Sequence, residues 1–93
     1  MKSVDVVKRD GKRSTESFER AKLERSIRAA MRAVKAPEGQ AEDTASAVCD
    51  VVVQWLDSKP EVTSADLRRQ AVQALEPLHP EAAIIYKHYK VIM

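Results

Sequence analysis

An Asp-Gly pair near the N-terminus constrains the fold of this 93-residue chain more than any other feature. Asp10-Gly11 separates two short β-prone segments, residues 4–8 and 13–18. Such a pair is a strong hairpin signal, because glycine accepts the positive φ that a tight turn needs. The sequence therefore predicts an antiparallel β-hairpin, with Phe18 turned inward against whatever the hairpin packs on.

Apolar residues at helical spacing predict four helices after the hairpin, over residues 20–34, 41–56, 64–76 and 80–92. The residues expected on their buried faces are Leu23, Ile27, Ala30, Val34, Ala45, Val48, Cys49, Val52, Trp55, Leu56, Leu67, Ala71, Ala74, Leu78, Ala82, Ile85, Tyr86, Tyr89 and Ile92. The third helix opens on Thr63-Ser64-Ala65-Asp66, a variant of the capping box, and His79 is expected to cap the fourth helix.

A hairpin of two short strands is not stable by itself in water. We therefore expect it to lie as a lid over a compact bundle of four short helices. The predicted fold class is mainly α, and a chain of this length has room for one modest core. Residues 1–93 are accordingly predicted to form a single domain.

Positive charge is concentrated in the first third of the chain. Residues 1–35 hold eleven Lys/Arg and five Asp/Glu, a balance of +6, whereas residues 36–93 hold five and nine, a balance of −4. A basic hairpin beside a helix N-terminus favours an anionic ligand. On the first helix, Lys22 lies at the flank of the buried stripe, and Arg25, Arg28 and Arg32 fall on the opposite side.

The segment from Val7 to Lys22 resembles the opening of the ATP-cone domain. This domain is the regulatory nucleotide-binding module of many ribonucleotide reductases and of a bacterial repressor of their genes. The matching residues are Val7, Lys8, Arg9, Asp10, Gly11, Glu16, Phe18, Glu19 and Lys22. The Thr63-Ser64 cap and the closing helix pattern, Ala83 to Lys90, extend the likeness over nearly the whole chain. The resemblance implies the same fold, a hairpin with four helices.

The resemblance also implies a site for ATP or dATP with Mg²⁺. The candidate nucleotide-binding residues are Lys8, Arg9, Glu16, Glu19, Lys22, Ser64 and Lys90. The cations would neutralise phosphate, and Glu16 would accept a hydrogen bond from adenine or the sugar, or would instead pair with a lysine across the hairpin. Glu19 stands where the family more often has aspartate, and it can equally act as a helix cap. Arg68 and Lys87 are weaker candidates.

Several classes of function lack their signatures in this sequence. It has no Ser-His-Asp constellation, paired catalytic carboxylates, Walker-type glycine loop or dinucleotide fingerprint, so the chain is not expected to be an enzyme. Cys49 is the only cysteine, which excludes an internal disulfide and a cysteine-based zinc site. With no apolar leader and no run of membrane-spanning length, the protein is predicted to be cytoplasmic.

The predicted function is an ATP/dATP-sensing allosteric domain, either free-standing or part of a larger protein. It would modulate a partner, related to ribonucleotide reductase or not, or the assembly of a homo-oligomer. One alternative is a nucleic-acid-binding module that uses Arg25, Arg28, Arg32 and Lys35 on the first helix. Nucleic acid is not the expected ligand, because no aromatic residue interleaves with these cations. Another alternative is an oligomerisation domain that no longer binds nucleotide.

Overall fold

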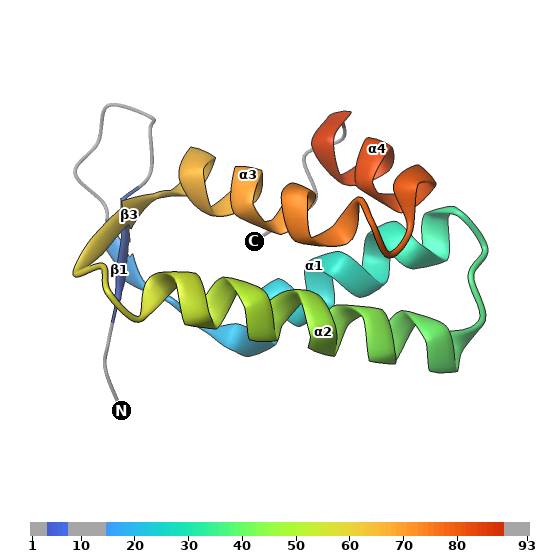
Figure 1. Cartoon of the computed structure of the whole chain (residues 1–93), viewed down its shortest axis with the longest axis horizontal. Coiled ribbons are helices and arrows are strands. Elements are labelled where there is room, and N and C mark those ends of the chain that lie inside the picture. The colour runs from blue at the N-terminus through green and yellow to red at the C-terminus, as the bar shows by residue number, and fades with distance from the viewer. Residues whose placement is uncertain (1–3, 8–14, 89–93) are drawn as a thin grey trace.

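The computed structural model describes residues 4–7 and 15–88, and it confirms a mainly α fold with an N-terminal β-hairpin (Figure 1). The elements are β1 (Asp5–Val7), β2 (Thr15–Ser17), α1 (Arg20–Ala33), α2 (Glu38–Leu56), β3 (Glu61–Thr63), α3 (Ser64–Leu75) and α4 (Pro80–His88). The described strands form one sheet in the order β2-β1-β3, which lies at one end of the helices. None of the described helices has the length and apolar character needed to cross a membrane.

The third strand, β3, was not predicted, and it explains how so short a hairpin is held. The central strand β1 pairs antiparallel with β2 and parallel with β3, so Val6 lies between Glu16 and Val62. Val6 and Val62 are both buried, and β1 and β3 both contact α3. The hairpin is thus anchored to the helices by a strand from the middle of the chain and by two buried valines.

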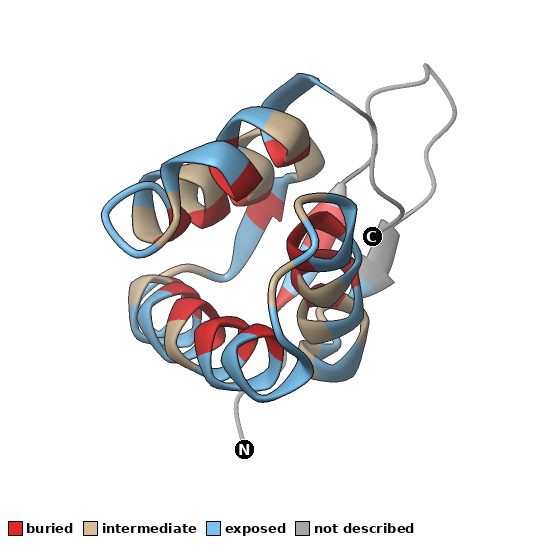
Figure 2. Cartoon of the chain, turned by 90° about the vertical axis from the view of Figure 1, so that its right-hand side faces the viewer, coloured by how far each residue is buried: buried red, intermediate tan, exposed pale blue. Residues whose placement is uncertain are grey.

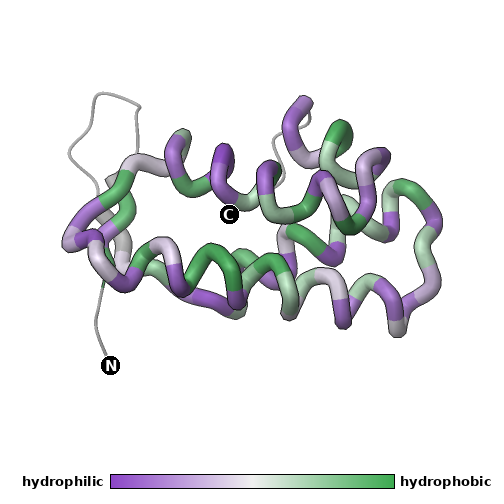
Figure 3. The backbone as a smooth tube through the Cα atoms, in the orientation of Figure 1, coloured by the Kyte–Doolittle hydropathy of each residue, from purple (hydrophilic) through white to green (hydrophobic). Residues whose placement is uncertain are grey.

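The four helices pack around one core. α1 packs mainly on α2, α3 packs on α2, and α4 packs on both α1 and α3. Figure 2 shows the buried positions turned toward the interior of the molecule, with exposed positions on the outside. Hydrophobic residues of α2 are concentrated in its C-terminal half (Figure 3). The largest fully buried side chains are those of Leu23, Ser26, Ile27, Met31, Val48, Cys49, Val52, Leu75 and Tyr86.

The predicted buried faces need two corrections. Leu78 is 49% exposed, because α3 ends at Leu75 and the chain no longer follows the helical period beyond it. Leu75, which was not predicted, is fully buried instead. Val34, Trp55, Ala74 and Ile85 are only partly buried but pack against the core. The ammonium of Lys59 lies 5.3 Å from the centroid of the Trp55 ring. Tyr89, predicted to be buried, lies outside the described residues, as does Ile92.

The second helix also begins three residues earlier than predicted. α1 ends at Ala33, and Lys35 then adopts a left-handed conformation with φ 60°. Pro37 occupies the N-cap position of α2, so that Glu38 begins the helix and Gly39 lies inside its first turn. A proline beside the first helical residue loses no hydrogen bond, since the first N–H groups of a helix have no partner within it. The whole connection between α1 and α2 is therefore short.

The two predicted caps are present at the starts of α3 and α4. The Thr63 Oγ1 accepts a hydrogen bond from the Asp66 N–H at 3.0 Å. The return half of the capping box is replaced by an ion pair, in which the Asp66 carboxylate lies 3.1 Å from Arg69 Nη2. At the start of α4, His79 Nδ1 accepts from the Ala82 N–H at 3.2 Å. His79 is therefore a capping residue.

We expect Thr63→Ala to lower the free energy of unfolding by about 1 kcal/mol, because it removes the oxygen that accepts from the Asp66 N–H. Urea unfolding followed by circular dichroism measures the loss. Thr63→Ser keeps the oxygen and is expected to retain most of the stability. Equal losses in the two variants would contradict a capping role and point to lost packing of the Thr63 methyl group.

The stability of the fold is also expected to fall at alkaline pH. Burial raises the pKa of the Cys49 thiol from 9.0 and that of the Tyr86 phenol from 10.0, each to about 12. The folded state therefore keeps protons that the unfolded chain releases. The stabilisation is complete below pH 9 and is lost toward pH 12, at about 1.4 kcal/mol per pH unit or less for each group.

Urea unfolding at pH 8, 10 and 11 tests this dependence. The free energy of unfolding of Cys49→Ala should fall less steeply over that range than that of the unsubstituted chain, whatever its value at pH 8. Parallel declines for the two proteins would show that the buried thiol does not contribute.

Candidate functional site

One end of the sheet brings together three parts of the chain that are far apart in sequence. The strand registers place Val7, Thr15 and Thr63 side by side. The chain leaves β1 here toward residues 8–14, and α3 begins here at Ser64. The candidates Lys8 and Arg9 follow Val7 directly in the sequence but lie outside the described residues, and so does Lys90.

The N-terminus of α3 supplies backbone donors at this end of the sheet. Ser64 is the first residue of α3 and is half-buried. The first N–H groups of a helix and the helix dipole both favour an anion. Asp66 lies in the same turn. Its N–H donates to the Thr63 hydroxyl oxygen, and its carboxylate is paired with Arg69. The position of Ser64 is therefore compatible with the predicted contact to an anionic ligand.

The opposite end of the sheet leads into α1. Asp5, Ser17 and Glu61 pair there. Glu19 is the N-cap of α1, but its side chain makes no capping hydrogen bond and is exposed. Its carbonyl accepts from the Lys22 N–H at 3.2 Å. The Lys22 side chain is half-buried.

The chain thus enters α3 at Ser64 from one end of the sheet and continues from the other end into α1, whose first turn carries Lys22. Strands of three residues separate those ends by only about 7 Å, at about 3.3 Å per residue. The backbone of Glu16 lies between them, opposite Val6, although its side chain is outside the described part of the structure. The predicted site residues that are described therefore lie in the strands of one small sheet or shortly after them in the sequence.

A cavity of about 380 Å³ lies between α3 and α4. Its lining residues are Ala65, Arg68, Arg69, Val72, Gln73, Glu76 and Lys87. Arg69 is paired with Asp66, and Arg68 and Lys87 face the carboxylate of Glu76, so the lining keeps a positive charge and favours an anion. The cavity begins in the first turn of α3, next to Ser64, and its volume lies within the range of about 300–1,000 Å³ typical of small-molecule sites. Arg68 and Lys87, the weaker candidates, are thus brought together.

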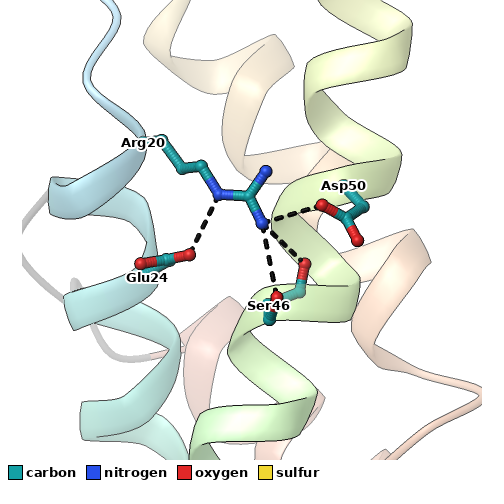
Figure 4. Close-up of polar contacts among 4 residues, drawn as sticks. All are labelled: Arg20, Glu24, Ser46 and Asp50. Carbon is teal, nitrogen blue, oxygen red and sulfur yellow. Dashed lines mark hydrogen bonds and ion pairs between the residues drawn. The ribbon is translucent and has the colours of Figure 1, made fainter.

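Arg20 has a role that the sequence did not reveal. Its guanidinium reaches from the first turn of α1 to the middle of α2 (Figure 4). Arg20 Nε lies 2.9 Å from Glu24 Oε2, and Nη2 lies 2.8 Å from Asp50 Oδ1. Nη2 also donates to the Ser46 carbonyl at 3.2 Å and to the Ser46 hydroxyl at 3.4 Å. Hydrogen bonds to Glu24 and Asp50 raise the pKa of Arg20.

The Arg20 contacts fix the turn of α1 that carries Lys22 against α2. The Glu24 pair is visible in the sequence as an i,i+4 spacing. The Asp50 contact spans thirty positions and depends on the packing of α1 against α2. For this reason only half of the cluster could have been found from the sequence.

The arginine face of α1 lies beside an acidic helix. Arg32 Nη2 lies 2.8 Å from Glu38 Oε1 at the start of α2. This hydrogen-bonded pair raises the pKa of Arg32 and lowers that of Glu38. Arg25 is exposed and Arg28 is half-buried. Residues 36–58 contain five Asp or Glu and no Lys or Arg, so α2 partly neutralises the positive charge of α1.

Comparison with known families settles the class of the chain. A family model described as the ATP cone domain matches residues 4–91, which span both ends of the sheet and all four described helices. No significant match was found among curated proteins or among solved structures. ATP-cone domains are regulatory domains that bind ATP or dATP. The match confirms the resemblance drawn from the sequence: this chain belongs to the ATP-cone domain family, a family of nucleotide-binding regulatory modules.

Proposed function

We propose that this chain binds ATP or dATP, together with Mg²⁺, and acts as an allosteric regulatory module without a reaction of its own. The family match over residues 4–91 is the observation that carries the proposal. The proposed nucleotide-binding residues are Lys8, Arg9, Glu16, Glu19, Lys22, Ser64 and Lys90. We further propose that residues 1–93 form a single domain and that the protein acts in the cytoplasm.

The geometry around the sheet supports a nucleotide as the ligand. Ser64 offers a helix N-terminus and directly precedes Ala65, which lines the same cavity as Arg68 and Lys87. The other end of the sheet, about 7 Å away along the strands, leads into the turn of α1 that carries Lys22. A nucleoside triphosphate is long enough to contact both ends, with phosphates beside cations and the base or sugar beside Glu16. A single phosphate group is too short to do so.

Mg²⁺ requires no protein cage in such a site. In nucleotide complexes it binds mainly through the phosphates and keeps several waters. Among the described residues, no group of three or more His, Cys, Asp or Glu is placed to hold a metal ion. We therefore propose that the metal enters with the nucleotide, and that the protein acts on the phosphates through Lys and Arg side chains.

Regulation needs more than binding. A nucleotide shifts a protein between two states only by the difference in its affinity for them. We propose that ATP and dATP favour different states of the surface that contacts a partner, either a protein related to ribonucleotide reductase or another protein, or a second copy of the chain. The affinity of the nucleotide would then change by the same factor on association.

The nucleic-acid alternative receives less support from the structure. Arg32 is paired with Glu38, and the arginine face of α1 adjoins a helix that carries only acidic charge. An extended phosphate backbone would meet these carboxylates as well as the arginines. A protein that follows nucleic acid instead needs a continuous basic face.

Titration calorimetry with ATP, dATP and GTP, each with Mg²⁺, tests the proposed ligand. We expect adenine nucleotides to bind, and Lys8→Ala/Lys22→Ala to weaken the affinity by about a hundredfold or more, because hydrogen bonds to charged groups are worth about 1.5–3 kcal/mol each. Arg25→Ala/Arg32→Ala also removes two cations from the basic part of the chain, so it is the matched control. It should keep the affinity of the unsubstituted protein.

The outcomes distinguish an error in the proposed ligand from an error in the proposed binding residues. Failure of both adenine nucleotides to bind at millimolar concentration would overturn the proposed function. If the two double variants bind ATP equally well, the residues proposed for the site are wrong although the ligand is right. Binding to DNA at low salt that is lost in Arg25→Ala/Arg32→Ala would favour the nucleic-acid alternative.

Sedimentation with and without nucleotide tests the proposed regulation in this chain alone. We expect saturating dATP to change the distribution between monomer and oligomer relative to ATP, because a switch requires differential affinity of the two ligands. Lys8→Ala/Lys22→Ala should not respond at the same concentrations. An identical distribution in all conditions would show that self-association is not the regulated property, and would leave a partner protein as the proposed target.

A further inference from the structure

A buried hydrogen bond links α1 to α4 across the core. The hydroxyls of Ser26 and Tyr86 lie 3.0 Å apart, and the exposed fractions of these residues are 2% and 1%. The Ser26 hydroxyl also donates to the Leu23 carbonyl at 2.8 Å. Since a serine hydroxyl has one hydrogen, the bond between α1 and α4 must be donated by the Tyr86 phenol. The direction of the bond is therefore fixed by its surroundings.

The two residues stand next to different parts of the proposed site. Ser26 is four residues, about one helical turn, after Lys22 on α1. Tyr86 directly precedes Lys87, which lines the cavity between α3 and α4. Burial raises the pKa of Tyr86, and Arg68 lines the same cavity as Lys87. The hydrogen bond thus joins the turn of α1 that follows Lys22 to the residue of α4 next to Lys87.

The bond adds something that apolar packing does not supply. The helix α4 contacts α1 and α3, and its other buried residues are Ala82 and Ala83. The hydrophobic attraction that these small side chains provide is non-directional. A buried hydrogen bond has a defined distance and angle, so it selects one position of α4 against α1.

We propose that Ser26 and Tyr86 are positioning residues for the nucleotide site. Their hydrogen bond sets the position of α4 against α1, and thereby holds the cation-lined cavity of α3 and α4 at a fixed distance from Lys22. A ligand that contacts both sides then meets a preformed arrangement of charges and does not have to order it on binding. The inference rests on the proposed function, because it concerns the binding of the same nucleotide.

Tyr86→Phe is the direct test, because it removes only the hydroxyl and leaves Ser26 bonded to the Leu23 carbonyl. We expect the far-UV circular dichroism spectrum to remain unchanged and the dissociation constant for ATP to rise about three- to tenfold, the factor that corresponds to one ordinary hydrogen bond. Ser26→Ala should weaken binding at least as much, since it leaves the buried phenol without its acceptor. The double variant should bind no more weakly than Ser26→Ala alone.

Val52→Ala is the matched control for a general loss of stability. Val52 is fully buried on α2, and its truncation leaves a cavity without touching the bond between α1 and α4. It should lower the melting temperature at least as much as Tyr86→Phe and leave the affinity for ATP unchanged. All titrations are made at a temperature where thermal melts show every variant to be folded.

The inference is overturned if Tyr86→Phe binds ATP as tightly as the unsubstituted protein, if Val52→Ala weakens binding equally, or if the effects of Ser26→Ala and Tyr86→Phe add in the double variant. If the unsubstituted protein binds neither ATP nor dATP, the proposed function itself fails, and this inference fails with it. Titration of the unsubstituted protein therefore distinguishes the two failures before any variant is made.

Discussion

The parallel pairing of β1 with β3 is the contact on which the rest of this structure depends. Strands of three residues form too few hydrogen bonds to be stable as an isolated hairpin. The pairing surrounds β1 with strands on both sides and buries Val6 and Val62. It also brings the chain leaving β1 next to the start of α3. The same contact that stabilises the hairpin thus creates the junction where the proposed nucleotide site lies.

The helices were predictable from the sequence because their signal is local, whereas the junction was not. Leu23, Ile27 and Ala30 repeat at helical spacing, and the structure buries all three. Glu61-Val62-Thr63 is too short to show a strand pattern, and its partners in β1 lie 56 positions earlier in the sequence. Leu78 continues the helical spacing of apolar residues, but it lies beyond the end of α3 at Leu75, where that spacing no longer predicts burial. Candidate binding residues could be identified from the sequence, but the cavity that Arg68 and Lys87 both line could not.

Charge shows the same division between local pattern and packing. The excess of cations in residues 1–35 suggested an anionic partner for that whole part of the chain. In the folded protein, Arg20 and Arg32 each form an ion pair with a carboxylate of α2, that of Asp50 and that of Glu38, with a nitrogen–oxygen distance of 2.8 Å in each pair. Such exposed pairs contribute little to the stability of the fold. Their larger consequence is that the positive charge of α1 is partly neutralised along its length. In the cavity between α3 and α4, Arg69 is paired with Asp66, and the remaining cations Arg68 and Lys87 face the carboxylate of Glu76.

These features make the position of α4 important for the proposed site. Its described part is nine residues long, and a helix of that length has little stability of its own. Its place is set by packing on α1 and α3 and by the hydrogen bond between Tyr86 and Ser26. Because Lys87 lines the cavity while Tyr86, its neighbour in sequence, lies in the core, the hydrogen bond that holds Tyr86 also fixes the part of α4 that brings Lys87 to the cavity. Ile84 on the same helix is 56% exposed, so the position of α4 also determines where an apolar part of the outer surface lies.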